Sequence, residues 1–307
     1  MKTSTPISAL EDLPYFDGHC DTLTALDGRY GRLCLELDRE SFSARGQVFA
    51  ICGDISPRPM DELFGTCISR YFSFPGVAPC RSAEEFIAAE KAGLCAGVLG
   101  IEGAEVIDCS LSLLEKAAEI GVKIISPTWN IYNGLCGTAS EMTGRGLTSA
   151  GIKFCRKAVT LGMKLDVSHA SDCAIADMAE LFPGSVFASH SNSRAVCGHR
   201  RNIPDELFSK IASVGGCVGI NLYSPFVDEN CADISRVADH ICHFVSLVPG
   251  GEKHVSLGCD LDGCDSLPGG ISGSGDVALI AEELFSRGFD RESIIDIFHN
   301  NLFRFIF

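Results

Sequence analysis

Eight short apolar runs recur along the chain, and most of them are continuously apolar rather than alternating with polar residues. Runs rich in Val, Ile, Leu, Phe and Cys are typical of strands covered on both faces, as in a parallel sheet. The eight runs are Tyr15–Asp21, Gln47–Gly53, Cys95–Glu102, Val122–Asn130, Lys164–His169, Ser185–His190, Cys217–Tyr223 and His254–Asp260. This pattern predicts eight buried strands.

Segments with helical periodicity lie between most of these runs, and several have recognisable ends. Ser82 and Glu85 form a capping box at the start of one helix, and Gly121 ends another. The expected helices are Ser82–Gly93, Leu111–Ile120, Ser149–Leu161, Ala170–Leu181 and Pro204–Val214, with two more between Asp276 and Phe307 that are divided at Gly288. Strand–helix units without a break in composition predict an α/β fold, a (β/α)8 barrel of the TIM type, with residues 1–307 as a single domain.

The competing fold is a doubly wound open sheet, but no Gly-x-Gly-x-x-Gly motif follows the first strand. Two connections, Asp54–Arg81 and Ile131–Leu147, are longer than is typical for a barrel. We expect the first of them to cover the active face. A Gly-rich segment, Leu267–Gly275, is expected to form a flexible loop after the eighth strand.

Composition narrows the class of protein further. The chain has 307 residues, of which 46% are apolar, and a net charge of −15, which disfavours nucleic acid and anionic membranes as partners. No apolar run approaches the ~18 residues of a membrane span, and the amino-terminal residues do not form a signal peptide. The sixteen cysteines include no Cys-x-x-Cys pair, so most are expected to be buried hydrophobic residues in a reducing compartment. These features predict a cytoplasmic protein.

The predicted strand ends carry the candidate chemistry. They hold three histidines and at least three carboxylates, namely His19, Asp21, Glu102, His169, His190 and Asp260. In a (β/α)8 barrel the carboxyl ends of all strands open at one mouth, so these side chains converge there. A single histidine at a strand end is more simply explained by a hydrogen bond to the backbone. Two Ser-His pairs at matching positions leave that explanation and metal binding both open.

So many carboxylates at one place would repel one another, and two divalent metal ions would resolve that repulsion. Imidazole and carboxylate suit zinc, with manganese or cobalt as alternatives. Glu102 is suited to bridge the two ions, because one carboxylate has two oxygens. Asp260 would then be free to act as general base on the attacking water and to pass the proton to the leaving group. The terminal ligands would be His19, Asp21, His169 and His190.

Residues outside the cluster include one arginine, one aspartate and the remaining histidines. Arg201 follows the sixth strand, where it is either a surface residue or a cation that binds an anionic group of the substrate. Asp166 lies three residues before His169, and an odd separation on a strand puts the two side chains on opposite faces, so no role is assigned to it. The other histidines, among them His240, are interpreted as structural or surface residues.

These segments together resemble the membrane (renal-type) dipeptidase family of metal-dependent amidohydrolase barrels. The matching stretches are Asp17–Asp21, Gly100–Gly103, Gly146–Gly151, Leu165–Ser171, Ala188–Asn192, Arg201–Leu207, Leu257–Gly263 and Asn301–Arg304. The resemblance implies two zinc ions, one held by His19, Asp21 and Glu102 and the other by Glu102, His169 and His190. It also implies that Asp260 is the proton shuttle and that Arg201 binds the terminal carboxylate of a dipeptide. The family often tolerates a D-residue at the carboxyl-terminal position and tends to form homodimers.

The chain departs from the family pattern at two positions. Cys20 stands where Asn is usual, and its side chain should point away from the metals. Trp129 stands where well-studied members carry a histidine that contacts the scissile carbonyl oxygen, and its indole N–H is able only to donate a hydrogen bond. We therefore expect Trp129 to contact the substrate and to alter substrate range more than metal binding.

The sequence thus predicts a soluble zinc dipeptidase. One alternative is another hydrolase of the same superfamily, acting on a cyclic amide, a lactone or a deaminase substrate. Arg201 argues against it, because a neutral ring would not need that cation. A second alternative is a non-catalytic, metal-dependent binding protein, against which the presence of Asp260 argues.

Overall fold

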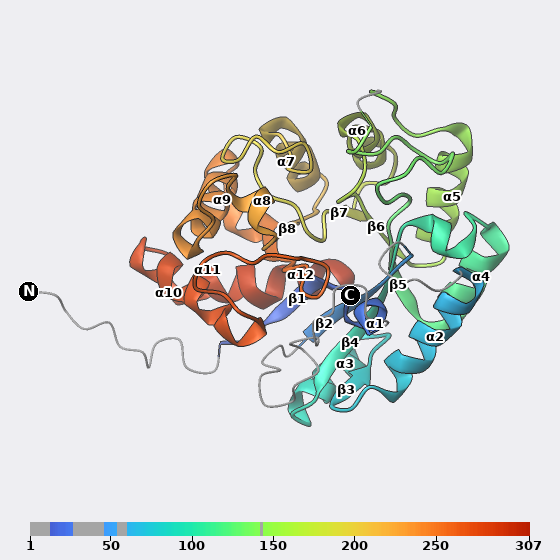
Figure 1. Ribbon diagram of the computed structural model, residues 1–307, viewed down its shortest axis with the longest axis horizontal. Helices are drawn as coiled ribbons and strands as arrows, with labels where there is room; N and C mark the ends of the chain where they lie inside the picture. Colours follow the sequence, from blue (N-terminus) through green and yellow to red (C-terminus); the bar gives the residue numbers. More distant parts are fainter. Residues whose placement is uncertain (1–12, 27–45, 54–59, 142–143) are drawn as a thin grey trace, which may run out of the picture.

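The computed structural model describes residues 13–26, 46–53, 60–141 and 144–307, and its centre is a parallel sheet (Figure 1). Neighbouring strands follow the order β7-β6-β5-β4-β2-β1-β9-β8, and β3 pairs with the start of β4. The strands are β1 (Phe16–Cys20), β2 (Gly46–Cys52), β3 (Val77–Pro79), β4 (Cys95–Glu102), β5 (Val122–Ile125), β6 (Lys164–Asp166), β7 (Val186–Phe187), β8 (Val218–Ile220) and β9 (Val255–Leu257). All eight predicted strands are therefore present, and β3 is an addition to them.

A single bridge closes the sheet into a barrel. Ala188, just after β7, pairs in parallel with Val218 of β8. The Ala188 N–H donates to the Cys217 carbonyl oxygen at 3.0 Å, and the Gly219 N–H donates to the Ala188 carbonyl oxygen at 2.8 Å. The expected (β/α)8 barrel is confirmed, and every strand end on one side faces the same mouth.

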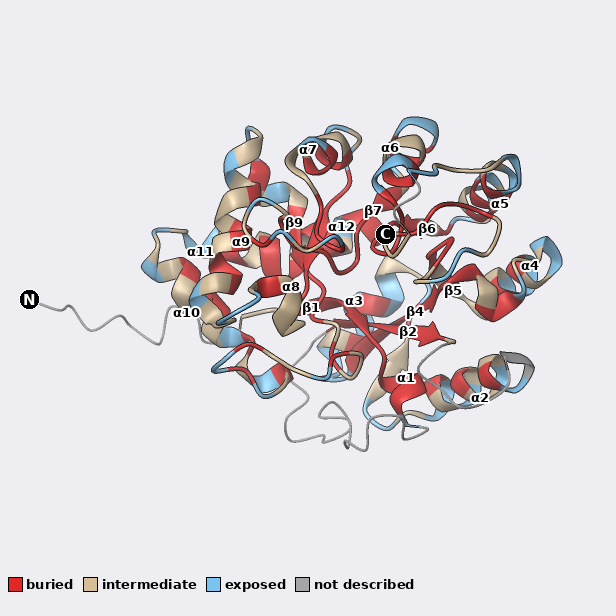
Figure 2. Cartoon of the chain, turned by 45° about the horizontal axis from the view of Figure 1, so that its top comes forward, coloured by how far each residue is buried: buried red, intermediate tan, exposed pale blue. Residues whose placement is uncertain are grey.

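Helices surround the barrel, with their buried faces turned toward the strands (Figures 1 and 2). They are α1 (Thr22–Ala25), α2 (Met60–Ser73), α3 (Ala83–Lys91), α4 (Leu111–Ile120), α5 (Ser149–Thr160), α6 (Asp172–Leu181), α7 (Asp205–Ser213), α8 (Ser224–Val227), α9 (Ile234–Leu247), α10 (Ala278–Ser286), α11 (Arg291–Ile295) and α12 (Asn301–Ile306), with a π-helical segment, Asp296–Asn300, between the last two. The predicted cap at Ser82 is confirmed, because its hydroxyl accepts from the Glu85 N–H at 3.3 Å. The Thr148 hydroxyl caps α5 in the same way and accepts from the Gly151 N–H at 3.0 Å. Gly288, with φ at +96°, divides the last helices as expected.

Two hydrophobic clusters fill the molecule, one inside the barrel and one between the strands and the helices. Along β2, Val48 belongs to the inner cluster, whereas Phe49 and Ile51 belong to the outer one. The inner cluster is closed at the amino-terminal end of the barrel by Leu302 and Phe305 of α12. The Asn301 side-chain amide also donates to the Val255 carbonyl oxygen at 2.7 Å, which fixes α12 against β9.

Several sequence expectations need correction, and one of them is the run Val122–Asn130, which forms a strand only as far as Ile125. The run Lys164–His169 forms a strand only as far as Asp166, and Ser185–His190 only at Val186–Phe187. The N–H groups of Ser168 and Ser189 donate to the Asp166 side chain instead of to a neighbouring strand. The long connection after β2 contains α2 and β3, while residues 54–59 lie outside the described part of the chain. The helix expected from Ala170 begins at Asp172, after a Ser171 cap. Among the described residues, no helix combines the length and apolar character needed to cross a membrane.

Candidate metal centre and substrate pocket

The structure brings the six predicted side chains together at the carboxyl end of the barrel. His19 lies in β1 and Glu102 ends β4, whereas the others follow β1, β6, β7 and β9 closely. All are buried except Asp260, whose side chain is 14% exposed, and they are His19, Asp21, Glu102, His169, His190 and Asp260. A register shift in β1 between Asp17 and Cys20 changes the alternation of side chains there. Cys20 packs in the outer hydrophobic cluster, away from the site, as expected.

Glu102 lies at the centre of this cluster. Its Oε1 atom is 2.8 Å from His169 Nε2, 3.4 Å from His190 Nε2 and 3.6 Å from His19 Nε2. His19 Nε2 is in turn 3.7 Å from Asp21 Oδ2 and 4.0 Å from Asp260 Oδ1. One carboxylate therefore links a histidine pair on one side with a histidine–aspartate group on the other, as a bridging ligand would.

Several polar atoms in the cluster have no hydrogen-bond partner, although they are buried. His19 Nε2 and Asp21 Oδ1 are two such atoms. Potential ligand atoms lie within 4.8 Å of one another in several sets of three residues, which include His19–Glu102–His190 and His19–Asp21–Asp260. Buried polar atoms without partners are costly, and nitrogen and carboxylate oxygen are the donors that zinc and similar cations prefer. The residues present fit a divalent metal centre.

Burial and mutual repulsion shift the ionisation of the cluster. Burial raises the pKa of Asp21 to about 8 and that of Asp260 to about 6, and the neighbouring Glu102 charge adds to both. Burial opposes ionisation of Glu102 too, but the charge of His19 holds the pKa of Glu102 well below its ordinary range. Burial, reinforced by the Arg201 charge, lowers the pKa of His169 to about 4. His169 is therefore neutral near pH 7, which is the form that binds metals.

Asp166, to which the sequence analysis assigned no role, lies directly behind the histidines. Its Oδ1 accepts from the Ser168 N–H at 3.0 Å, the Ser168 hydroxyl at 2.7 Å and the Ser189 N–H at 2.9 Å. Its Oδ2 accepts from the hydroxyls of Ser126 at 2.9 Å and Ser189 at 2.7 Å. The serine that precedes each histidine was the available signal, because the Ser-His pair occurs twice.

This network determines which nitrogen of His190 faces the cluster. The Ser189 hydroxyl donates its proton to Asp166, so it can only accept from His190 Nδ1–H, which is 2.7 Å away. The proton on Nδ1 leaves the Nε2 lone pair directed toward Glu102. Asn130 Oδ1 accepts from His169 Nδ1 at 2.9 Å and gives that ring the same tautomer. Such partners are typical of metal-binding histidines.

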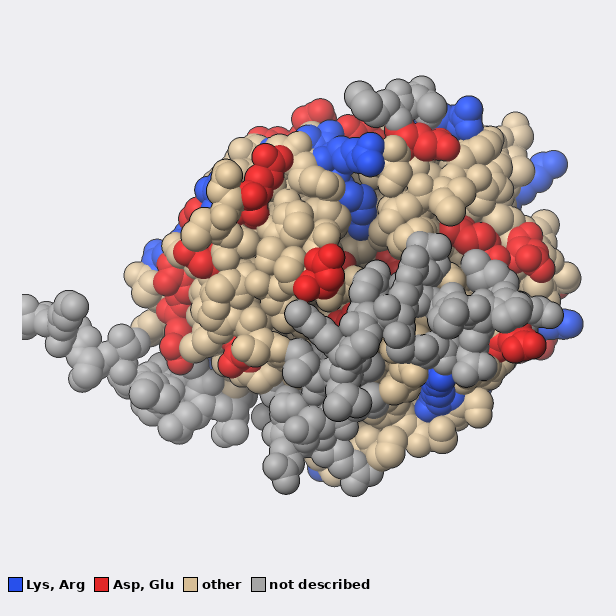
Figure 3. All heavy atoms as spheres, viewed as in Figure 1, with Lys and Arg blue, Asp and Glu red and all other residues tan. Residues whose placement is uncertain are grey.

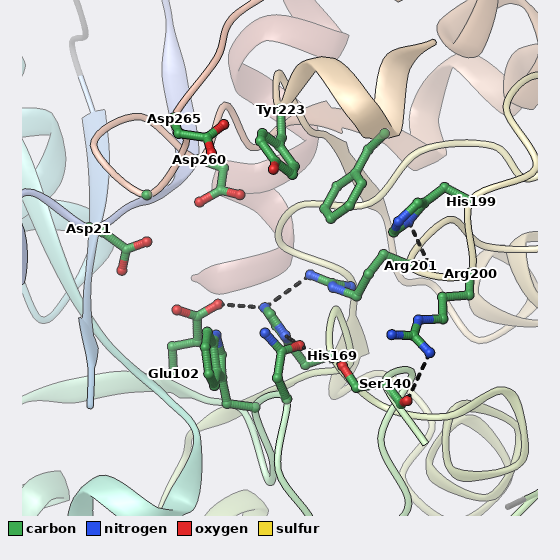
Figure 4. Close-up of a pocket in the computed structure, with 14 residues that line it drawn as sticks. Asp21, Glu102, Ser140, His169, His199, Arg200, Arg201, Tyr223, Asp260 and Asp265 are labelled. Carbon is green, nitrogen blue, oxygen red and sulfur yellow. Dashed lines mark hydrogen bonds and ion pairs between the residues drawn. The ribbon is translucent and has the colours of Figure 1, made fainter. Parts of the chain in front are cut away.

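A cavity of about 330 Å³ opens in front of the cluster (Figure 4). Asp21, Glu102, Asp260 and Asp265 lie on one side of it, whereas Arg200, Arg201 and His199 lie on the other. The remaining lining residues include Trp129, Asn130, Tyr223 and Phe226. The pocket is therefore polarised, with carboxylates at one end and cations at the other.

Arg201 is buried in this pocket, which excludes the interpretation as a surface residue. It is 7% exposed, and its Nη2 donates to His169 Nε2 at 2.9 Å and to His190 Nε2 at 3.0 Å. Its Nη1 is buried without a hydrogen-bond partner. Burial lowers the pKa of Arg201 to about 10, so the side chain stays positively charged near pH 7.

Trp129 and Asp260 complete the pocket wall. The Trp129 ring lies 5.8 Å from the His169 ring, centroid to centroid. Asp260 has a positive φ of 59°, which is a strained conformation for a residue with a side chain. The Asn221 side-chain amide donates to Asp260 Oδ2 at 2.9 Å and holds the carboxylate toward the cavity. Asn221 was not identified from the sequence, because a single Asn at a strand end carries no specific signal.

This chain has a (β/α)8 barrel with a buried cluster of histidines and carboxylates at its mouth. That combination is typical of metal-dependent hydrolases. Comparison with known families is more specific: residues 71–306 match the model of the membrane dipeptidase family, peptidase family M19, and the chain belongs to that family. His19 and Asp21 precede the matched residues, so their place in the cluster depends on the geometry alone.

The chain is similar to several known proteins. An uncharacterised dipeptidase of Schizosaccharomyces pombe is 35% identical over 197 residues, which cover 62% of this chain and 47% of the relative. Human dipeptidase 3 is 30% identical over 330 residues, which cover 96% of this chain and 65% of the relative. The chain thus spans less than two thirds of the length of these relatives.

A solved structure shows the same fold. It is that of a metallopeptidase from Rhodobacter sphaeroides, which was crystallised with a phosphinate mimic of the dipeptide L-Ala-D-Ala. It is 24% identical to this chain, with a TM-score of 0.83, and the match covers 96% of this chain and 98% of the other.

Proposed function

We propose that this protein is a zinc-dependent dipeptidase with a two-metal centre. The observation that carries the proposal is the position of Glu102, whose Oε1 lies within 3.6 Å of three imidazole nitrogens in a pocket that ends in a buried arginine. One ion would be held by His19, Asp21 and Glu102, and the other by Glu102, His169 and His190. When bound, the metal ions would lower the pKa of a water molecule and polarise the scissile carbonyl group.

Asp260 moves the proton in this proposal. Its carboxylate accepts a proton from the attacking water and then donates it to the amine that leaves. In the metal-free site, burial raises the pKa of Asp260 toward neutrality, the direction that suits a group that both accepts and donates a proton. Asn221 keeps one oxygen occupied as an acceptor, which orients the other oxygen toward the reacting atoms.

The polarised pocket orients the dipeptide. Arg201 binds the terminal carboxylate, and the carboxylates at the opposite end face the free amino group. A charge-assisted contact with a guanidinium is strong and directional, so it selects substrates that end in a carboxylate. Trp129 donates its indole N–H toward the peptide group. The substrates include L,D-dipeptides, because the related barrel from Rhodobacter sphaeroides binds a mimic of L-Ala-D-Ala.

The test combines metal analysis with a substrate panel. The purified protein is analysed for bound metal and assayed on L,L- and L,D-dipeptides, with and without chelator. We expect two zinc ions per chain and turnover that is lost with chelator and restored by zinc. Substoichiometric zinc after reconstitution would contradict the two-metal centre. Full occupancy with turnover of a cyclic amide instead of dipeptides would favour the other hydrolase class, and no turnover at all would favour a binding protein.

The proposal includes a homodimer, which is supported only by the resemblance to the dipeptidase family. Light scattering coupled to size-exclusion chromatography should give twice the chain mass of 32.8 kDa. A mass of one chain at assay concentration would contradict it.

A further inference from the structure

A cysteine lies beside the candidate metal centre, at the end of a strand to which no chemistry was assigned. Cys52 is the last residue of β2 and is fully buried. Its Cα is the register partner of the Cα of Glu102 on the neighbouring parallel strand β4. Register partners on adjacent strands point to the same face of a sheet, so Cys52 and Glu102 both point into the barrel mouth.

The alternation of side chains along β2 leads to the same orientation. Val48 belongs to the cluster inside the barrel, whereas Phe49 and Ile51 belong to the cluster outside it. Cys52 is four residues after Val48, an even separation that returns it to the inner face. It lies at the inner mouth of the barrel, above the apolar core.

Cys52 forms a potential ligand group with two carboxylates. The ligand atoms of Asp21, Cys52 and Glu102 lie within 4.8 Å of one another, and all three residues are buried. Asp21 is 2% exposed, and its Oδ1 atom has no hydrogen-bond partner. A buried carboxylate oxygen without a hydrogen-bond partner, next to a sulfur atom and a second carboxylate, fits a cation-binding group better than an ordinary core contact.

We propose that Cys52 is a further ligand of the metal centre, and that it binds a zinc or cadmium ion together with Asp21 and Glu102. The sulfur–metal bond forms as the thiol proton passes to water, so the metal replaces that proton. Sulfur favours zinc and cadmium over manganese, and Cys52 therefore sets the metal preference of this end of the site. The proposal rests on the proposed metal centre and is independent of the reaction catalysed there.

The test uses the ultraviolet absorption that a cadmium–thiolate bond produces. The exposed Cys173 and Cys231 are first alkylated in the folded protein, and the metal-free protein is then titrated with cadmium. We expect a charge-transfer band that saturates with the first tightly bound ions in the wild type and is absent in Cys52→Ala. The affinity for cadmium in that variant should fall roughly 10- to 100-fold. Cys52→Ser serves as a second variant of nearly the same size.

Cys20→Ala is the matched control, because Cys20 is equally buried near the site but packs in the outer cluster. It should keep both the band and the affinity. A band of equal strength in Cys52→Ala, or cadmium bound by equilibrium dialysis without a band in the wild type, would overturn the proposal and leave the dipeptidase centre intact. A wild type that binds no metal at all would overturn both.

Discussion

Arg201 connects the two parts of the pocket, since its guanidinium contacts His169 and His190 while its Nη1 remains without a partner. We predict that Arg201→Ala raises KM for dipeptides and lowers kcat/KM by roughly 10- to 150-fold, the equivalent of about 1.5–3 kcal/mol for a charge-assisted hydrogen bond. Metal content should change little. Steady-state kinetics together with metal analysis measures both effects.

Arg200→Ala is the matched control for this prediction. Arg200 also lines the pocket, but it is exposed and donates to the Ser140 carbonyl oxygen at 2.9 Å. Its loss should leave KM nearly unchanged. If Arg201→Ala reduced turnover equally for dipeptides and for their carboxyl-terminal amides, the assigned contact with the terminal carboxylate would be wrong.

Asp166 fixes the tautomer of His190 through the hydroxyl of Ser189. Asn has nearly the same shape as Asp, but its side-chain NH2 group is a donor. That group would face hydroxyl and N–H groups that themselves donate to Asp166 in the wild type. We predict that Asp166→Asn weakens metal binding by roughly 10- to 100-fold, because the His190 tautomer is no longer determined. Competition with a chromogenic chelator measures the affinity.

Ser126→Ala is the control for Asp166→Asn, since it removes one hydrogen bond to Asp166 and none to a histidine-bearing segment. Its metal affinity should stay within a few-fold of wild type. The Asp166→Asn variant should also be less stable than the wild type without added metal, as measured by thermal unfolding. Buried donors lose their acceptor in this variant, which costs about 1–3 kcal/mol of folding free energy. Unaltered metal affinity in that variant would contradict the positioning role.

The residues of the site differ in how far a sequence reveals them. Histidines and carboxylates at strand ends are chemically distinctive, so the six cluster residues and Arg201 were predicted, and the structure brings them together. Asp166, Asn130 and Asn221 act by hydrogen bonds to residues distant in the chain. Those pairings depend on which strands become neighbours, and a single sequence does not contain that information.

The same contrast appears among the helices and strands. Most predicted helix ends were correct within two residues, because capping side chains and positive-φ glycines act locally. The strands β6 and β7 were predicted too long. Their apolar character continues to His169 and His190, but Ser168 and Ser189 draw the backbone toward Asp166 and end the ladder. The strand β3 is short and partly exposed, so the sequence contains no apolar run that would predict it.

One helix carries a buried ionisable group that links several elements. His240 of α9 is fully buried, and its Nδ1 accepts from the Ser193 N–H at 3.1 Å. Its Nε2 donates to the Val227 carbonyl oxygen of α8 at 2.9 Å. Burial lowers the pKa of His240 from 6.5 to about 4, against the hydrogen bond to Val227, which raises it.

We therefore predict a pH-dependent stability contribution from His240. The unfolded chain takes up a proton near pH 6.5 and the folded chain only near pH 4, so stability is full above pH 6.5 and falls as pH decreases toward 4. The loss should reach up to about 3 kcal/mol at about 1.4 kcal/mol per unit of pKa shift. Denaturant unfolding of the wild type and of His240→Gln between these pH values measures the difference. Parallel curves for the two proteins would contradict this assignment.

At the scale of the whole molecule, charge is unevenly distributed. The chain carries a net charge of −15. On the face shown in Figure 3, acidic side chains spread over the flanks and also lie near the centre, whereas basic side chains gather at the upper part of the central hollow. Basic side chains at the entrance of a negatively charged molecule favour the approach of a small anionic group. The overall charge disfavours large polyanions as ligands.

Metal binding should also stabilise the whole barrel. The cluster joins β1, β4 and the segments after β6, β7 and β9, so a bound ion connects strands from both halves of the ring. We predict that chelator lowers the melting temperature by several degrees, since a ligand at a hundredfold excess over its Kd contributes about 2.7 kcal/mol. Calorimetry of stripped and reconstituted protein measures this change. His19→Ala should reduce the shift, and an unchanged melting temperature in the wild type would argue against a stabilising centre.

The packing of residues 296–306 against β1 and β9 has a consequence for how the chain is synthesised. About 240 residues separate β1 from β9, and a ribosome adding about 5–20 residues per second needs roughly 12–48 s to make them. During that time β1 has neither its neighbour β9 nor the apolar cover from α12. Closure of the strand ring is therefore a late event. Until α12 has been synthesised, the nascent chain exposes an unpaired strand edge that is prone to aggregation.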